Sequence, residues 1–374
     1  MVSIARSSLI FEWRRYLAAV LAVTFAGLLV VVQLALLLGL FGTVSVVIDR
    51  STADLWVGFR NTPSVDLGRP IGPTSDVIAW VHPGVGRIER FISVYGDLRR
   101  ADGVPVSVVI NAIEVAPSGL AFDRLFSARE RALLREPNAI LIDGADTEKL
   151  GAAVGATVEI NGKRARIAGV VEGLRAIGGV NVVASFSTAR SLAPETAEQV
   201  TFYLIRLKPG FSPVTVAGEI ADRRTIPRYS VWTAAEFSAR SQSYWLLESG
   251  AGIGSGFASL LALLVGVAIT SQTLSGAILA SIKEFAALRA LGVSRRSLRA
   301  TVLEQALWIG VIGLALAASL TAALAWLGAR WRIAMLFPEW MLAGVAALML
   351  GIAALSGWLA LRPLLRAEPA SLLR

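Results

Sequence analysis

The sequence predicts a membrane protein with four membrane-spanning helices and one large α+β domain, which is extracytoplasmic and is inserted between the first and second spans. Composition is the first observation: the 374-residue chain has a mean hydropathy of +0.63 and only 17% charged residues, against roughly 25% in soluble domains. The second observation is the pattern, because long apolar runs lie before residue 43 and after residue 247, with a polar block between them.

The distribution of charge sets the expected orientation. The block 43–247 has nearly equal numbers of acidic and basic residues, so most of the net charge of +9 comes from short segments beside the apolar runs. Basic residues in such segments mark the cytoplasmic side. We therefore expect an inner-membrane protein with the N-terminal segment 1–16, the loop 282–299 and the tail 362–374 in the cytoplasm, and no nucleic-acid partner.

The first span is expected over 17–42. This run is apolar except for Thr24 and Gln33, and it is long enough to cross a hydrocarbon core about 30 Å thick. A signal peptide is the alternative, since Arg14 and Arg15 resemble a twin-arginine export signal. The span is favoured because the apolar part of a signal peptide covers only about 7–15 residues.

The block 43–247 has the pattern of a folded α+β domain. Short apolar runs bounded by turn residues predict strands at 55–59, 104–110 and 139–142. Asn161-Gly162 lies between two alternating runs and predicts a hairpin, because these residues accept the positive φ angles of a type I′ turn. A strand-helix-strand pattern follows over 200–232.

Residues suited to catalysis are sparse. The chain has no cysteine, so it offers neither thiolate chemistry nor a Cys-ligated metal, and its one histidine, His82, cannot build a zinc site by itself. The sequence from Trp80 to Gly84 favours an ordinary histidine where a strand end runs into a turn. We expect no catalytic residue, metal or cofactor, and an anchored periplasmic enzyme is the weakest hypothesis of function.

Three further spans are expected after the domain. The run 248–281 exceeds the bilayer core when helical, so it should extend as an extracytoplasmic stalk. The runs 300–328 and 340–361 are ordinary spans, and the outer loop 329–339 between them has aromatic residues typical of a membrane interface.

Glycines open the second of the four spans. Gly252 and Gly256 lie four residues apart, a spacing that lets membrane helices approach closely. We expect a packing or dimer surface there rather than a flexible hinge.

The loop 282–299 contains the main functional signal. An apolar stripe on a short helix is predicted by the three-residue spacing of Ile282, Phe285, Leu288 and Leu291. Gly292 can take the left-handed conformation that ends a helix, and Ser294 suits the N-cap of the next one. Such a helix, joined to spans at both ends, can convert a push from a cytoplasmic partner into helix movement. The alternative is a basic loop that only sets topology.

This segment resembles the loop of FtsX/MacB-type ABC transporter permeases (type VII ABC exporters), in which an RE-x-x-x-LRALG-x-S run forms the helix that contacts the ATPase. The chain reads KEFAALRALGVSRR over 283–296, with Lys283 in place of the usual arginine and Phe285 where a smaller aliphatic residue is common. The resemblance implies an ATPase-coupling role for Lys283, Glu284, Phe285, Leu288, Arg289, Leu291, Gly292, Arg295 and Arg296.

Other parts of the chain support the same resemblance. The tail 362–374 contains EPASLLR, similar to the DP-A-x-x-LR ending of the family. The order of one span, a periplasmic domain and three spans matches a MacB-like permease fold. Within the family, the segments 54–57 and 63–67 look most like those of DevC-type permeases.

The resemblance implies a permease that forms a dimer, most simply a homodimer, and pairs with a separate MacB-like ABC ATPase subunit. DevC-type members also work with a periplasmic membrane-fusion protein and an outer-membrane channel, and export glycolipids or other amphiphiles. The chain lacks a Gly-x-x-x-x-Gly-Lys-Ser/Thr phosphate loop, so we expect the partner to use the ATP. The alternative is an FtsX-like transducer, which transports nothing and activates periplasmic cell-wall hydrolases.

The predicted orientation can be tested by labelling single cysteines, since the chain has none of its own. We expect Ser118→Cys to react with a membrane-impermeant maleimide in intact spheroplasts, and Ser297→Cys to react only after permeabilisation. The opposite labelling pattern would contradict the orientation.

Overall fold

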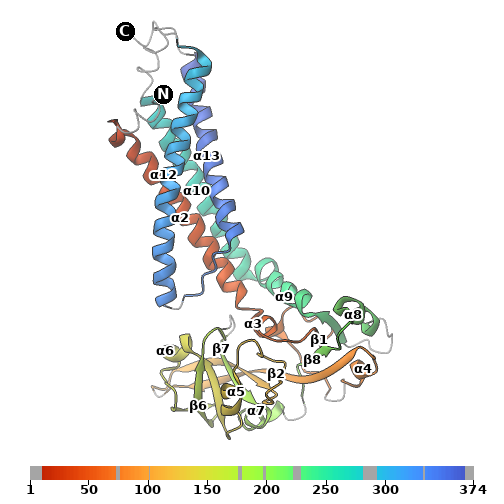
Figure 1. The fold of residues 1–374 in the computed structure, drawn as a ribbon. Helices are drawn as coiled ribbons and strands as arrows, with labels where there is room; N and C mark the ends of the chain where they lie inside the picture. Colours follow the sequence, from red (N-terminus) through yellow and green to blue (C-terminus); the bar gives the residue numbers. More distant parts are fainter. Residues whose placement is uncertain are drawn as a thin grey trace. The chain divides into compact units, whose positions relative to one another are not determined.

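The computed structural model describes residues 11–72, 76–100, 102–175, 179–196, 199–221, 229–280, 293–331 and 333–366 (Figure 1). The chain divides into two compact units. Unit 2 is the continuous segment 40–253, and unit 1 consists of the residues before and after it.

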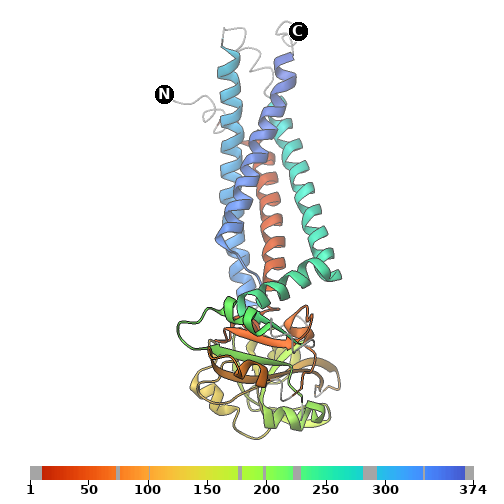
Figure 2. The ribbon, with the colours of Figure 1, turned by 90° about the vertical axis from the view of Figure 1, so that its right-hand side faces the viewer.

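Four helices in the described part of the chain are long and apolar enough to cross a membrane. They are α2 (Trp13–Gly42), α10 (Gly250–Ala280), α12 (Arg295–Arg330) and α13 (Glu339–Arg366). The four helices run side by side in both views (Figures 1 and 2). Helices suit a bilayer because they satisfy their own backbone N–H and C=O groups, for which lipid offers no partner.

Small and apolar side chains hold α2, α12 and α13 together. Their buried cluster contains Tyr16, Ala19, Val20, Val23, Ala26, Leu298, Val302, Ala306, Ile309, Met341, Val345, Met349 and Ala353. Gly313 of α12 lies so close to α2 that a Cβ atom there would be 2.7 Å from the Cβ atom of Val23. The Thr24 hydroxyl, 3.2 Å from the Gly313 carbonyl oxygen, donates a hydrogen bond across the same contact.

The helices of unit 1 extend beyond the predicted spans. α2 begins at Trp13, before the predicted span at residue 17, and α13 continues to Arg366, beyond the predicted end at residue 361. α12 begins at Arg295, before the predicted span at residue 300 but where the predicted N-cap Ser294 places the start of the helix. The predictions ended each span where charged residues begin. The helices continue because arginine is a good helix former and the backbone hydrogen-bond pattern does not depend on lipid.

The run 248–281 does not begin as one continuous helix. Tyr244–Glu248 form a turn of π-helix (η4), and Ser249 is extended, with φ −82° and ψ 145°. The Ser249 hydroxyl accepts a hydrogen bond from the backbone N–H of Gly252 at 3.0 Å, so it caps α10. The predicted stalk is therefore interrupted at Ser249, where a new helix starts.

The strands in the described part of unit 2 form one nine-stranded sheet, and the long strand β2 (Val85–Arg99) belongs to both of its parts. The first half of β2 pairs with β8 in an antiparallel part of order β2-β8-β1-β9. The second half pairs with β3, and the strands β3-β7-β4-β6-β5-β2 close into a barrel. The other bounds are β1 Leu55–Phe59, β3 Pro105–Ile113, β4 Ala139–Asp143, β5 Thr157–Ile160, β6 Lys163–Val171, β7 Val180–Ser185, β8 Phe202–Leu207 and β9 Tyr229–Thr233.

Short helices surround this sheet. They are α3 (Val46–Asp49), α4 (Val77–Trp80), α5 (Ala128–Leu133), α6 (Thr147–Leu150), α7 (Phe186–Leu192), α8 (Pro213–Ala221) and α9 (Ala234–Ser243), with 3₁₀ turns at Val65–Leu67, Gly144–Asp146 and Pro194–Thr196. α4 and α8 pack on one face of the four-stranded part. α3 and α9 contribute to the apolar core on its other face.

An aromatic cluster fixes α9 to the sheet. Trp56 of β1 is fully buried, and its ring centroid lies 5.6 Å from that of Phe202 and 5.9 Å from that of Phe237 in α9. Phe237 also stacks on Trp232 at 4.6 Å. Aromatic contacts of this kind add to the free energy gained by burial alone, so α9 is firmly seated.

The hairpin prediction is confirmed, whereas the prediction for Trp80 is wrong. Asn161 and Gly162 both have positive φ angles, 49° and 74°, and they join β5 to β6. Trp80 ends the helix α4 rather than a strand. His82 lies in the turn between α4 and β2, in agreement with the prediction of a loop histidine, and its side chain is buried because it bonds to Gly84 of this turn and to Glu219 of α8.

Candidate functional site

Most of the predicted coupling helix lies outside the described residues. Seven of the nine predicted coupling residues fall in the segment 281–292, which the structure does not describe: Lys283, Glu284, Phe285, Leu288, Arg289, Leu291 and Gly292. The other two, Arg295 and Arg296, lie in the first turn of α12 rather than in a loop.

The structure does describe the beginning of α12, directly after this segment. Ser294 is extended and its hydroxyl accepts a hydrogen bond from the backbone N–H of Ser297 at 3.2 Å. The prediction that Ser294 is the N-cap is confirmed. Val293 packs against the apolar core of unit 1, and Leu298 is buried in it. The end of the coupling segment is therefore joined to a fixed helix start.

On the other side of the segment, α10 is tied to α2. The Arg15 guanidinium donates a hydrogen bond to the carbonyl oxygen of Ala280, the last described residue of α10. Arg15 also pairs with Glu12 at 2.7 Å. From the sequence, Arg15 indicated a topology signal or, with Arg14, a twin-arginine motif; no local pattern predicts a contact 265 residues away.

The two predicted packing glycines of α10 have different surroundings. A Cβ atom at Gly252 would overlap the carbonyl oxygens of Trp245 and Leu246, so Gly252 permits the tight turn into α10 within its own chain. At Gly256, a Cβ atom would meet no described atom within 4 Å. The close approach of α10 to α2 occurs instead at Gly266, where a Cβ atom would be 3.1 Å from that of Ala26.

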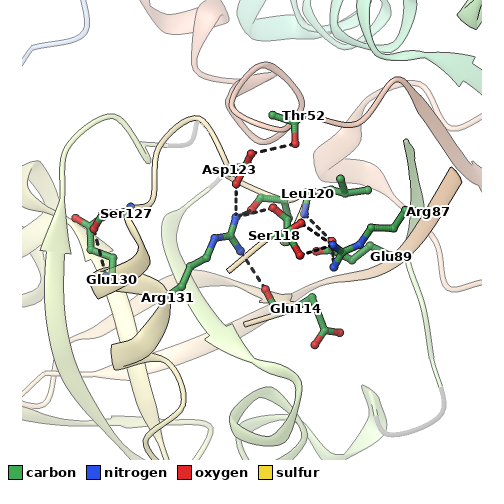
Figure 3. A network of polar contacts seen from close by, with 12 residues as sticks. Thr52, Arg87, Glu89, Glu114, Ser118, Leu120, Asp123, Ser127, Glu130 and Arg131 are labelled. Carbon is green, nitrogen blue, oxygen red and sulfur yellow. Dashed lines mark hydrogen bonds and ion pairs between the residues drawn. The ribbon is translucent and has the colours of Figure 1, made fainter. Parts of the chain in front are cut away.

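A buried polar network in unit 2 holds the loop 114–126 (Figure 3). Arg131 of α5 is 1% exposed, and its guanidinium donates to the carbonyl oxygens of Glu114, Gly119 and Ala121 at 2.7–3.1 Å. An aspartate, Asp123, lies 3.6 Å away. The guanidinium thus replaces the regular backbone pairing that this loop lacks.

Glu89 holds the same loop from β2. Its carboxylate is buried and accepts the backbone N–H of Leu120 at 2.5 Å, while the Arg87 guanidinium lies 3.7 Å away (Figure 3). Burial raises the pKa of the Glu89 carboxyl, opposed by the backbone N–H groups of Leu120 and Ala121 and by the charges of Arg87 and Arg131. Desolvation disfavours the charged form of a buried acid.

The loop also reaches the segment that follows α3. The backbone N–H of Thr52 donates to Leu120, and its hydroxyl lies 3.3 Å from the Asp123 carboxylate. The Arg124 guanidinium donates to the carbonyl oxygen of Asp49 at 3.2 Å. The network therefore joins the barrel side of unit 2 to α3, the first helix after α2.

The described residues contain no group of three or more His, Cys, Asp or Glu side chains that could hold a metal ion. His82 accepts the backbone N–H of Gly84 on Nδ1 at 3.0 Å, so its Nε2 carries the proton and donates to Glu219 at 2.7 Å. These two hydrogen bonds hold α8 against the turn that contains His82 and Gly84, so the role of His82 is structural.

Comparison with known proteins gives the family. Residues 16–223 match the MacB-like periplasmic core domain, and residues 256–369 match the FtsX-like permease C-terminal region. The first match covers more than half of the chain. The chain therefore belongs to the family of membrane permeases that combine a MacB-like periplasmic core domain with an FtsX-like permease region. Such permeases belong to ABC-type systems, in which a permease works with an ABC ATPase and is generally not catalytic itself.

Three solved structures are similar to part of the chain. The periplasmic region of MacB from Actinobacillus actinomycetemcomitans is 11% identical, with 50% of this chain and 92% of that chain covered and a TM-score of 0.35. The extracellular domain of the ABC-type transporter YknZ from Gram-positive bacteria is 13% identical, with coverages of 48% and 100% and a TM-score of 0.33. A permease domain from Porphyromonas gingivalis is 17% identical, with coverages of 49% and 91% and a TM-score of 0.31. A comparison with curated proteins finds no match.

Arg131→Met should destabilise unit 2 by about 3 kcal/mol or more, because it leaves buried carbonyl oxygens without a donor and a buried carboxylate with less compensation. The change can be measured as the shift of the urea unfolding midpoint of the full-length protein, followed by tryptophan fluorescence. Arg129→Met, at an exposed position of the same helix, is the matched control and should leave the midpoint nearly unchanged. Equal shifts in the two variants would contradict the role of Arg131.

The Glu89 carboxyl should make stability depend on pH. Because its pKa is raised in the folded state, the folded protein takes up this proton at a higher pH than the unfolded chain, whose ordinary value is 4.5. Its contribution is therefore fully present below pH 4.5 and is lost as the pH rises through the raised value. Relative to Glu89→Gln, which cannot titrate, the wild type should gain stability as the pH falls across this window. Parallel midpoints for the two proteins at every pH would exclude this effect.

Proposed function

We propose that this chain is the permease subunit of an ABC exporter of the inner membrane, with several passes, both termini in the cytoplasm and unit 2 in the periplasm. It works as a homodimer with a separate MacB-like ABC ATPase subunit, which uses the ATP; the permease needs no cofactor of its own. The observation that carries this proposal is the pair of family matches, which together extend over residues 16–223 and 256–369.

The substrate and the periplasmic partner are proposed from the resemblance to DevC-type permeases. We propose that the complex exports an amphiphile, such as a glycolipid, from the periplasmic side, together with a membrane-fusion protein and an outer-membrane channel. A second copy of the chain is proposed to pack against α10 beside Gly256, whose surface meets no described atom of its own chain.

The coupling role of the segment 282–299 is supported by what flanks it. The contact between Arg15 and Ala280 lies just before the segment, and the Ser294 N-cap lies within it, where α12 begins. Because the segment is anchored to a membrane helix on each side, a force applied to it would move these two helices. We propose that the ATPase contacts this segment through its apolar stripe and basic side chains.

The second candidate is an FtsX-like transducer that activates a cell-wall hydrolase. The same family matches support it, because FtsX-like members share the permease region. Purification of the complex from membranes separates the two functions. A membrane-fusion protein bound together with the ATPase supports export, whereas a peptidoglycan hydrolase in its place supports transduction.

The coupling proposal predicts that Leu288→Asp uncouples the ATPase. A charge in the apolar stripe should abolish the stimulation of ATP hydrolysis in the reconstituted complex, while membrane insertion and yield stay normal. Ala290→Asp is the matched control. It introduces the same charge two residues along, which in an α-helix lies on the side opposite the apolar stripe, and it should retain most of the stimulation. Full stimulation in the Leu288→Asp complex would show that the stripe does not contact the ATPase.

A further inference from the structure

Unit 2 is joined to unit 1 by two chain connections, and a short helix lies beside each of them. α3 is the first helix after α2, and α9 is the last helix before η4 and α10. Four polar side chains of these two regions meet, and we call them the α3–α9 tie: Ser45, Asp49, Ser238 and Gln242.

Every member of the tie is used in a hydrogen bond. The Ser45 hydroxyl donates to Asp49 Oδ2 at 2.7 Å, and the Ser238 hydroxyl donates to Asp49 Oδ1 at 2.7 Å. The Gln242 amide donates to the Ser45 hydroxyl at 2.8 Å and to the Ser238 hydroxyl at 3.3 Å. Both carboxylate oxygens of Asp49 therefore hold a hydroxyl, one from each side of the contact.

The hydroxyls of Ser45 and Ser238 do not make the hydrogen bonds to their own helices that serines at such positions usually make. Ser45 precedes α3 as its N-cap residue, yet its hydroxyl caps no backbone N–H of that helix. A serine inside a helix commonly donates to the carbonyl group four residues earlier, whereas Ser238 donates to Asp49, 189 residues away. Ser45 is fully buried, and Ser238 is 9% exposed.

Both helices of the tie are also fixed to the rest of unit 2. α3 contributes Val47 and Ile48 to the apolar core that contains Phe237 of α9. The carbonyl oxygen of Asp49 accepts a hydrogen bond from Arg124, in the loop held by Arg131 and Glu89. The side chain of Asp49 is thus bonded to α9, and its backbone carbonyl group is bonded to the loop that packs on the barrel.

We infer that Asp49 is a positioning residue that holds α3 and α9 together as one rigid unit. The chain connection from α2 and the connection to α10 then cannot move independently of each other. This inference rests on the proposed function, because it assigns the tie the task of passing ATP-driven movement of both helices into unit 2 together. Without the tie, α9 can move while α3 stays in place, so only part of the movement of the long helices would reach the rest of unit 2.

The test measures the separation of the two helices in the full-length protein in lipid nanodiscs. Spin labels on Arg50→Cys and Ala239→Cys, both at exposed positions, report the distance between α3 and α9 in a chain without other cysteines. We expect one narrow distance distribution, unchanged when ATP and vanadate are added to the complex with the co-purified ATPase. With Asp49→Ala, or with the milder Ser238→Ala, the distribution should broaden in both conditions.

Two controls separate the tie from general damage. Ser243→Ala removes a hydroxyl of α9 that donates only within its own helix, to the Arg240 carbonyl oxygen at 2.9 Å, and should keep the distribution narrow. In the Asp49→Ala protein, Arg50→Cys and Ala239→Cys, both at exposed positions and joined by a short reducible crosslinker, should restore ATP-driven movement of unit 2, reported by a fluorophore on unit 2. Reduction of the crosslinker should abolish this rescue.

The outcomes are distinct. A distribution as narrow in Asp49→Ala as in the wild type overturns the inference, as does a wild-type distance that changes with ATP and vanadate. A second label pair, Leu264→Cys on α10 and Leu316→Cys on α12, reports whether ATP moves the helices of unit 1 at all. If that pair does not respond, the proposed function fails, while the width of the α3–α9 distribution without ATP still decides whether Asp49 holds the two helices together.

Discussion

The constraint on which the rest of the molecule depends is covalent: the segment 40–253 forms one compact unit, and only two peptide connections join it to the other unit. These two connections are the covalent routes between the long helices and unit 2. The residues beside them, α3 and Ser45 at one connection and α9, η4 and Ser249 at the other, are therefore the places where local structure matters most. Both are held by specific polar contacts as well as by apolar packing.

The polar contacts of unit 2 form a continuous path. Arg131 and Glu89 hold the loop 114–126 by its backbone, and this loop in turn contacts Thr52 and Asp49. Buried polar groups of this kind cost free energy unless they are hydrogen-bonded. Two atoms of this network, Oε1 of Glu89 and Nε of Arg131, are buried without a hydrogen-bond partner among the described residues, so the network is only partly satisfied. These contacts join the barrel part of unit 2 to the segment around α3.

In unit 1 the same physical rules give a different result. Lipid offers no hydrogen-bond partners, so the long helices satisfy their own backbone and meet through small residues such as Gly313 and Gly266. Specific hydrogen bonds join Thr24 to Gly313, Arg15 to Ala280 of α10 and, at the start of α12, Ser294 to Ser297. The segment proposed to contact the ATPase lies between Ala280 and Ser294.

Local signals in the sequence were sufficient for several elements. The Asn161-Gly162 turn and the Ser294 N-cap follow from the chemistry of one or two residues, and the structure confirms both. The capping-box sequence Ser127-Ala-Arg-Glu130 also indicates the start of α5, but the patterns considered in this block were mainly those of strands, and this helix was not predicted. The break at Ser249 was missed because an apolar run has the same composition whether or not one of its residues leaves the helix.

By itself, the sequence determined that long apolar helices flank a folded α+β unit, because hydropathy and turn chemistry act over short stretches of chain. Only the tertiary structure decided which polar residues act together. Asp49 and Ser238 are 189 residues apart, and Arg15 and Ala280 are 265 apart; no periodicity links residues at such separations. Their contacts arise when the sheet brings α3 against α9 and when packing in unit 1 sets α2 beside α10. The physical reason is that a hydrogen bond depends on position in space, and position is set by the packing of the whole fold.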